Sequence, residues 1–249
     1  MTEYEIGIVA AVEPELEAVK QRMDHLQCRK IYELEFWSGT ICNVSCLVVE
    51  CGVGKVNAAR AAQIMIDFYK ISRIFNVGTA GGMDRRLKVG DIIISNHSVQ
   101  FDYDRTALGN DLAHIPNLKS AYIASDPQLV EQCRMVMERL TDEACFENKI
   151  YAGTVVTGDI FKITDETCTR IKNNFNPLCI EMEGAAIAHV CELCNIPFVS
   201  VRSVSNAVTG SSMDEEEFWK FRAVAAERCA LFITAYCRTI PEFEEEVLV

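Results

Sequence analysis

Short runs of mostly apolar residues recur along the chain and are separated by polar or glycine-rich segments. Such runs, four to eight residues long, are typical of buried β-strands. We expect strands at Ile6–Ala11, Cys46–Glu50, Arg73–Val77, Ile92–Ser95, Ala152–Thr157, Leu178–Met182 and Phe198–Val204.

Apolar residues at helical spacing lie between several of these runs. In the first such segment, Pro14 suits a first-turn position and Leu16, Val19, Met23 and Leu26 repeat as on one helix face. Further helices are predicted over Lys55–Tyr69, from Gly184 through Ala188 onward, and from Asp214 to about Cys237, the last with Ser212-x-x-Glu215 as a capping box. Strands alternating with helices predict an α/β fold, with a mixed, mostly parallel twisted sheet flanked by helices on both faces.

The 249 residues contain no linker-like or low-complexity segment, and 49% of them are hydrophobic. We therefore expect a single domain over residues 1–249. The formal net charge is −12 without a Lys/Arg cluster, which argues against a nucleic-acid partner. The acidic runs Asp214–Glu217 and Glu242–Glu246 are read as solvated faces. No signal peptide and no membrane-spanning run is recognisable, so a cytoplasmic protein is expected.

Twelve cysteines are dispersed through the chain, several of them within apolar runs. Without a secretion signal, reduced thiols acting as small core residues are expected. Cys191-x-x-Cys194 has a metal-ligand spacing but stands alone, with His189 as the one nearby further ligand. We therefore predict no metal and no cofactor.

Glycines cluster where predicted strands end. Gly52-Val53-Gly54-Lys55 opens a helix, and Gly78-Thr79-Ala80-Gly81-Gly82 follows a strand as a predicted turn. Either segment could bring backbone N–H groups close to a ligand. Neither matches a dinucleotide fingerprint or a P-loop.

Polar residues gather at two further strand ends. Glu181-Met182-Glu183 closes one strand, and the strand that contains Arg202 ends in Ser205-Asn206. Ligands of open α/β sheets bind outside the carboxyl ends of the strands. These residues are therefore expected at one rim, where they suit a ligand rich in hydroxyls and ring nitrogens.

The order of these segments resembles the nucleoside phosphorylase/nucleosidase superfamily, and within it the 5′-methylthioadenosine/S-adenosylhomocysteine nucleosidases. The matching segments run from Ile6 to about Cys237, and the most specific are GTAGG…VGD and the E-M-E-x-x-A-I-A run that starts at Glu181. The resemblance implies a nucleoside phosphorylase-like fold. It also implies hydrolysis of the N-glycosidic bond of adenine nucleosides to adenine and a thioribose, through an oxocarbenium-like transition state.

The resemblance implies roles for individual residues. Glu15 would activate the attacking water, Glu183 would bind the ribose hydroxyls above Met182, and Glu181 would support it. Arg202 would orient a carboxylate, because its planar fork suits such pairing.

Further positions are carried over in the same way. Thr79, with Ala80 and Gly81 beside it, would lie near the ribose. Phe161 would stack on the purine, backbone groups of Phe161 and Lys162 would read its edge, and Val53 would line the pocket for the 5′-substituent. Leu108 and Pro116 match a loop that closes the pocket of the neighbouring subunit, so a homodimer is implied.

Asn206 departs from the family pattern, which has an Asp here to protonate the leaving adenine. An amide donates a hydrogen bond but delivers no proton, and loss of a general acid costs roughly 10²–10⁴ in rate. Two alternatives stay open: a native Asn that points to a 6-oxopurine nucleoside, or an engineered Asp→Asn change.

A second departure lies at Val208–Glu217, where Met213 stands in for an aromatic residue over the 5′-substituent, whose identity stays open. The hexameric phosphorylases of the superfamily have a phosphate-binding loop just after the first strand, where this chain has Glu13 and Glu15. Acids there would repel phosphate, so hydrolysis is favoured over phosphorolysis. A purine-nucleoside-binding protein without turnover is the non-enzymatic alternative, and retention of Glu15 and Glu183 argues against it.

Overall fold

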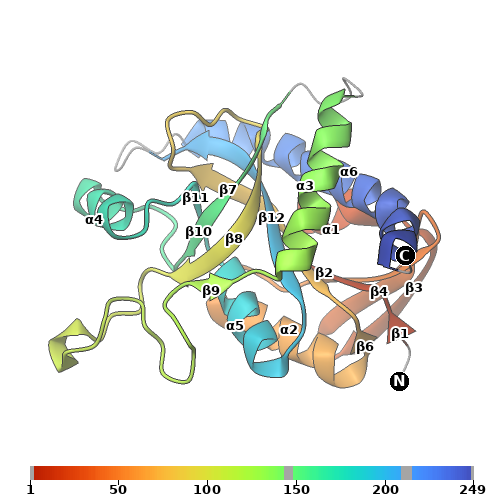
Figure 1. Cartoon of the computed structure of the whole chain (residues 1–249), viewed down its shortest axis with the longest axis horizontal. Helices are drawn as coiled ribbons and strands as arrows, with labels where there is room; N and C mark the ends of the chain where they lie inside the picture. Colours follow the sequence, from red (N-terminus) through yellow and green to blue (C-terminus); the bar gives the residue numbers. More distant parts are fainter. Residues whose placement is uncertain (1–2, 143–147, 209–214, 248–249) are drawn as a thin grey trace.

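The computed structural model describes residues 3–142, 148–208 and 215–247. One mixed sheet organises these residues (Figure 1), and its strands follow the order β11-β10-β8-β12-β7-β2-β5-β4-β3. The strands are β2 (Ile6–Ala10), β3 (Asp24–Ile31), β4 (Leu34–Ile41), β5 (Val44–Glu50), β7 (Ile74–Gly82), β8 (Ile92–Gln100), β10 (Ile150–Thr157), β11 (Cys179–Glu181) and β12 (Phe198–Ala207). Short β9 (Ile123–Ala124) pairs with β8, and β1 (Glu3–Tyr4) forms a separate parallel pair with β6 (Lys70–Ile71).

Part of the sheet closes on itself. Strand β11 pairs in parallel with β10 and antiparallel with β7, which joins the end of the strand order to its middle. The five strands of this ring each contribute to one small core, which contains Ala80, Ile93, Val155, Cys179 and Val204. The closure brings Glu181 at the end of β11 beside the end of β7.

Helices cover both faces of the sheet. The helices are α1 (Glu13–Lys20), α2 (Lys55–Phe68), α3 (Pro127–Asp142), α4 (Asp165–Phe175), α5 (Gly184–Cys194) and α6 (Glu215–Val247), with a 3₁₀ turn at Thr106–Leu108. Helices α1, α3 and α6 pack in one core with β2, β7, β8 and β12, whereas α2 and α5 pack in the core on the other face (Figure 1). The predicted α/β class, with a mixed sheet and helices on both faces, is confirmed.

Two local predictions are wrong. The first helix ends at Lys20, and Leu26 lies in strand β3, whose residues are exposed except at its last position. Residues Gly78 to Gly82 continue β7 rather than forming a turn, because they pair with β12 along their whole length. The capping Ser212 and the start of the last helix at Asp214 lie outside the described residues, and that helix runs past Cys237 to Val247.

Strands β2, β5, β7 and β12 run parallel, so their carboxyl ends meet along one edge of the sheet. The loop that leads into α1 starts at the end of β2, and Gly52–Gly54 join the end of β5 to α2. This edge gathers the polar segments that the sequence places at strand ends.

Candidate active site

A cavity that opens to solvent lies at this edge of the sheet. The cavity is lined by Ala11, Val12, Glu15, Val53, Thr79, Ala80, Gly81, Ile160, Phe161, Ile180, Glu181, Met182, Glu183, Arg202, Ser205, Asn206, Val208 and Phe218. Most of the site residues predicted from the sequence are therefore brought together.

Glu15 is buried at the start of α1, with 3% of its surface exposed. Its Oε2 accepts hydrogen bonds from the backbone N–H of Ala11 (2.9 Å) and Val12 (3.3 Å), and its Oε1 accepts one from the N–H of Thr79 (2.8 Å). A carboxylate offers about four lone-pair positions. Three are occupied by these N–H groups, which fix the carboxylate and leave capacity on Oε1 for one further donor in the cavity.

Gly78 makes room for this carboxylate. A Cβ atom at Gly78 would lie 2.7 Å from Oε1 of Glu15 and 2.6 Å from Nη1 of Arg202. Neither buried side chain can move away without losing its partners. A glycine is therefore needed where β7 passes between them.

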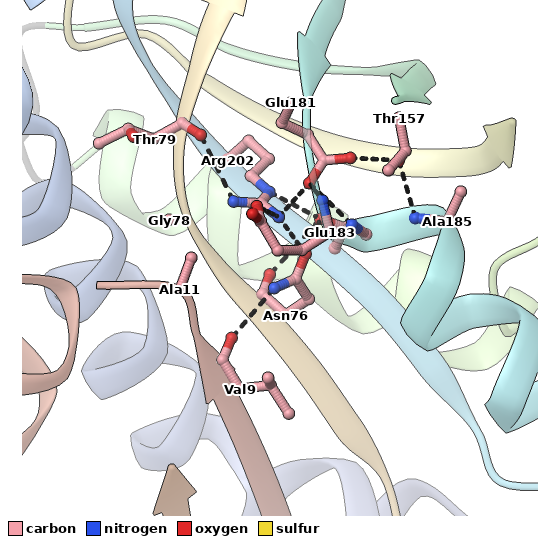
Figure 2. Close-up of polar contacts among 12 residues, drawn as sticks. Val9, Ala11, Asn76, Gly78, Thr79, Thr157, Glu181, Glu183, Ala185 and Arg202 are labelled. Carbon is pink, nitrogen blue, oxygen red and sulfur yellow. Dashed lines mark hydrogen bonds and ion pairs between the residues drawn. The ribbon is translucent and has the colours of Figure 1, made fainter. Parts of the chain in front are cut away.

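Glu181 is held by the protein on every side (Figure 2). Its Oε1 accepts a hydrogen bond from the Thr157 hydroxyl, and its Oε2 accepts from the N–H groups of Glu183 (2.9 Å) and Gly184 (2.7 Å) and from Nη2 of Arg202. The two N–H groups belong to the start of α5, where a carboxylate is also favoured by the helix dipole. Glu181 thus has little capacity left for a ligand and fixes the loop that carries Glu183.

Arg202 is 1% exposed and lies among these acids. Its Nη2 also donates to Oδ1 of Asn76, whose own amide donates to the carbonyl of Val9 at 3.0 Å (Figure 2). Nε of Arg202 donates to the Ser200 hydroxyl at 3.3 Å. Burial alone would lower the pKa of Arg202, but the carboxylates of Glu181, Glu183 and Glu15 raise it above its usual value.

Glu183 faces the cavity from the N-terminus of α5. Its Oε1 accepts a hydrogen bond from the N–H of Gly54 at 2.9 Å, and its Oε2 lies 3.5 Å from Nη2 of Arg202. Burial raises the pKa of Glu183 to about 7, against the opposing effect of Arg202. Glu181 and Glu183 are 6% and 4% exposed, so neither carboxylate is on the outer surface of the protein.

Asn206 and Ser205 form another wall of the cavity, at the end of β12. Asn206 is 1% exposed, and its Oδ1 accepts a hydrogen bond from the Ser205 hydroxyl at 2.8 Å. Its Nδ2 donates to the carbonyl of Ala207 at 3.4 Å, a long bond. The amide is thus oriented by its neighbours and retains donor capacity.

Comparison with known proteins identifies the family. The phosphorylase superfamily profile matches residues 5–238. A 5′-methylthioadenosine/S-adenosylhomocysteine nucleosidase of Desulfotalea psychrophila is 39% identical over 204 residues, which cover 82% of this chain and 84% of the relative. The chain belongs to this nucleosidase family. The resemblance seen in the sequence is confirmed.

Solved structures of family members share the fold. The nucleosidase of Colwellia psychrerythraea, crystallised with adenine, superimposes with a TM-score of 0.88 at 30% identity and covers 95% of this chain and 96% of its own. The S-adenosylhomocysteine nucleosidase of Streptococcus pyogenes, in complex with 5-methylthiotubericidin, gives 0.87 at 29% identity, with 97% and 99% covered. The nucleoside phosphorylase-like fold is therefore confirmed.

Lys162 is a predicted site residue that is exposed and does not line the cavity. Leu108 and Pro116, predicted to reach the pocket of a neighbouring subunit, are exposed and do not line the cavity of their own chain. Met213 lies outside the described residues. Phe218, which the sequence reading missed, lines the cavity and packs edge-on against Phe161 with ring centroids 5.2 Å apart.

The described cysteines are all free thiols, and Cys191 is buried in the core between α2 and α5. Within residues 3–142, 148–208 and 215–247, no group of three or more His, Cys, Asp or Glu is arranged to hold a metal ion. The same part of the chain contains no helix long and apolar enough to span a bilayer.

The raised pKa of Glu183 predicts that the Glu183→Gln variant is more stable than the parent protein at neutral pH. The unfolded chain ionises this group near 4.5 and the folded protein near 7, so the free energy of unfolding falls as pH rises between these values. Glutamine removes this penalty, which is at most about 3 kcal/mol. Denaturant unfolding at pH 5 and pH 8 should show a larger stabilisation at pH 8. An equal effect at both values would contradict the burial argument.

Proposed function

We propose that this chain hydrolyses the N-glycosidic bond of 5′-methylthioadenosine and S-adenosylhomocysteine, which releases adenine and a thioribose. The observation that carries the proposal is Glu15, a buried carboxylate fixed by three N–H donors with capacity left on Oε1 facing the cavity. The family membership supports the same substrate class.

In the reaction, the C1′–N9 bond breaks and its electron pair leaves with the purine, which takes up a proton from water to become neutral adenine. A water molecule forms the new bond to C1′, and Glu15 accepts its proton and afterwards returns it to water. A general base held in this way contributes about 10²–10⁴ in rate. Glutamate suits this role because its oxygen can accept a hydrogen bond from water and then the proton itself.

The sugar becomes positively charged in the transition state, and the cavity is built for such a charge. Three buried acids, Glu15, Glu181 and Glu183, face a single buried cation, Arg202. When all are ionised, the floor carries excess negative charge. Charge placed in advance where it develops in the reaction stabilises the transition state without reorganisation.

The remaining lining residues divide between the parts of the nucleoside. Glu183 accepts hydrogen bonds from the ribose hydroxyls above Met182, with Thr79, Ala80 and Gly81 alongside. Phe161 stacks on the purine, and Ser205 and Asn206 face its imidazole side. Val53 and Phe218 line the region of the 5′-substituent.

A direct test is base release by the purified protein without added phosphate. We expect adenine to appear from 5′-methylthioadenosine at a rate that phosphate does not change. The acids Glu13 and Glu15 stand just after β2, where phosphate would have to bind, and would repel it. Liquid chromatography of the sugar product distinguishes the free thioribose, formed by hydrolysis, from its 1-phosphate, formed by phosphorolysis. Release that requires phosphate would refute the water mechanism.

We further propose that two copies of the chain complete each other's sites. The segment between β8 and β9, with Leu108 at 70% exposure, extends away from the body of the molecule (Figure 1). Around the cavity mouth, Val53 and Phe161 are each 49% exposed. The corresponding segment of a second copy, which carries the exposed Leu108, would cover them. Sedimentation showing a monomer at micromolar concentration would refute this arrangement.

A further inference from the structure

The cavity continues into a second lobe that the proposed chemistry does not use. Most residues that line the lobe also line the cavity: Val12, Glu15, Val53, Thr79, Phe161 and Phe218. The lobe adds Pro14 at the start of α1 and Trp219 and Arg222 on the first turns of α6. A group that extends from the site of the reaction toward α6 would enter this lobe.

An aromatic wall leads along the lobe to a cation. Phe218 packs edge-on against Phe161 on one side and against Trp219 on the other, with centroids 5.2 Å apart in both pairs. The guanidinium of Arg222 lies over the Trp219 ring, 4.5 Å from its centroid. Stacking uses the face of a guanidinium and leaves the N–H groups at its edge available for a hydrogen-bond acceptor.

Arg222 has no acidic residue at the helix positions where ion pairs form along one face. Its neighbours three and four positions away are Phe218, Trp219, Ala225 and Ala226. Among the described residues, no carboxylate forms an ion pair with it. The half-buried guanidinium therefore borders the lobe with unused donor capacity.

Arg222 lies in surroundings that otherwise carry excess negative charge. The floor of the adjoining cavity holds three buried carboxylates and one arginine, and the whole chain has a net charge of −12. An anionic group on a substrate is repelled by such a field. A cation at the far end of the lobe would offset that repulsion for one class of substrate only.

We propose that Arg222 is a specificity-determining residue that binds the carboxylate at the end of a 5′-substituent. The aromatic wall accommodates the thioalkyl chain, and the guanidinium pairs with the carboxylate beyond it. S-adenosylhomocysteine carries such a carboxylate and 5′-methylthioadenosine does not, so Arg222 favours the first. The inference rests on the nucleosidase activity proposed above.

The test compares Arg222→Gln with Lys220→Gln. Lys220 lies on the same helix, is exposed, does not line the lobe and has Glu216 four positions before it, so its variant removes the same charge without touching the lobe. The substrates are S-adenosylhomocysteine, 5′-methylthioadenosine, and a matched pair: 5′-carboxyethylthio-5′-deoxyadenosine and its carboxamide. Adenine release gives kcat/KM for each.

For Arg222→Gln we expect kcat/KM to fall about tenfold for the two carboxylate substrates and to stay within about twofold for 5′-methylthioadenosine and the carboxamide. Arg222→Lys should retain part of the preference, and Lys220→Gln should leave it unchanged. An unchanged carboxylate-to-carboxamide ratio in Arg222→Gln, or an equal loss in Lys220→Gln, would overturn the inference. If the parent protein releases no adenine from any substrate, the proposed function itself fails, which is a separate result.

Discussion

Replacing Glu15 by Gln should lower kcat for 5′-methylthioadenosine about a thousandfold while the protein still binds nucleosides. Gln matches the size of Glu but cannot accept the proton of the attacking water. Its amide group must also face one of the backbone N–H groups of Ala11, Val12 or Thr79, which now all donate to the carboxylate. A cost of about 1–3 kcal/mol in folding is therefore expected as well.

Two measurements distinguish the loss of catalysis in Glu15→Gln from the cost in folding. Single-turnover adenine release reports the chemical step, and calorimetric titration with adenine reports an intact site. Glu17→Gln serves as the matched control, because Glu17 lies on the same helix, pairs with Lys20 at 2.7 Å and does not line the cavity. A folded Glu15→Gln protein that keeps more than about a tenth of the parent kcat would exclude Glu15 as the base.

The central strands were predictable from the sequence because apolar residues predominate in them. Every residue of β2 is buried and none is polar, whereas β12 is buried except at its last position and combines apolar residues with serines and Arg202. Strand β3 escaped prediction because it lies at the edge of the sheet and exposes seven of its eight residues. An exposed polar strand has no periodic pattern that distinguishes it from a loop.

Site residues that belong to recognisable motifs could be predicted from the sequence. Residues that only pack against the site could not. Glu15, Glu183 and Arg202 were found because they stand at strand ends or within specific motifs. Asn76 and Thr157 were missed, although they hold Arg202 and Glu181 in place. Asn76 lies inside β7 and Thr157 ends β10, and only the fold shows which buried charge each of them faces.

The pairing of β11 with β7, which closes the ring of strands, could not be predicted from the sequence. Ile180 pairs with Gly81 through an antiparallel contact between β11 and β7, two strands almost a hundred positions apart. Helical crossovers imply parallel neighbours and do not specify such a contact. Yet this closure places Glu181 and Arg202 together, and so determines the geometry of the acids in the cavity.

Replacing Asn206 by Asp should raise the hydrolysis of 5′-methylthioadenosine by roughly 10²–10⁴, because an Asp can protonate the leaving adenine. The position suits a proton donor. Asn206 is 1% exposed, and the Ser205 hydroxyl 2.8 Å from its Oδ1 can orient a carboxyl as it orients the amide. Burial disfavours the ionised form of a carboxyl, so an Asp here should retain its proton near neutral pH.

The acids of the cavity strengthen this expectation. Glu15, Glu181 and Glu183 line the same space, and like charges oppose ionisation of a fourth carboxyl group. The gained activity should therefore decline as pH rises through the pKa of the new Asp. The parent protein, which has an amide at this position, should show no decline from this group.

The substrate preference gives the decisive comparison for Asn206. With 5′-methylthioadenosine and 5′-methylthioinosine assayed side by side, Asn206→Asp should gain on the adenine nucleoside and gain less or lose on the 6-oxopurine. The Asn206→Ala variant is the control for space, because it removes the polar group without supplying an acid. Unchanged turnover of 5′-methylthioadenosine in a folded Asp variant would show that the leaving purine takes its proton from another source. A parent protein that prefers 5′-methylthioinosine would instead assign Asn206 to recognition of the 6-oxo group, since the amide N–H can donate to that oxygen.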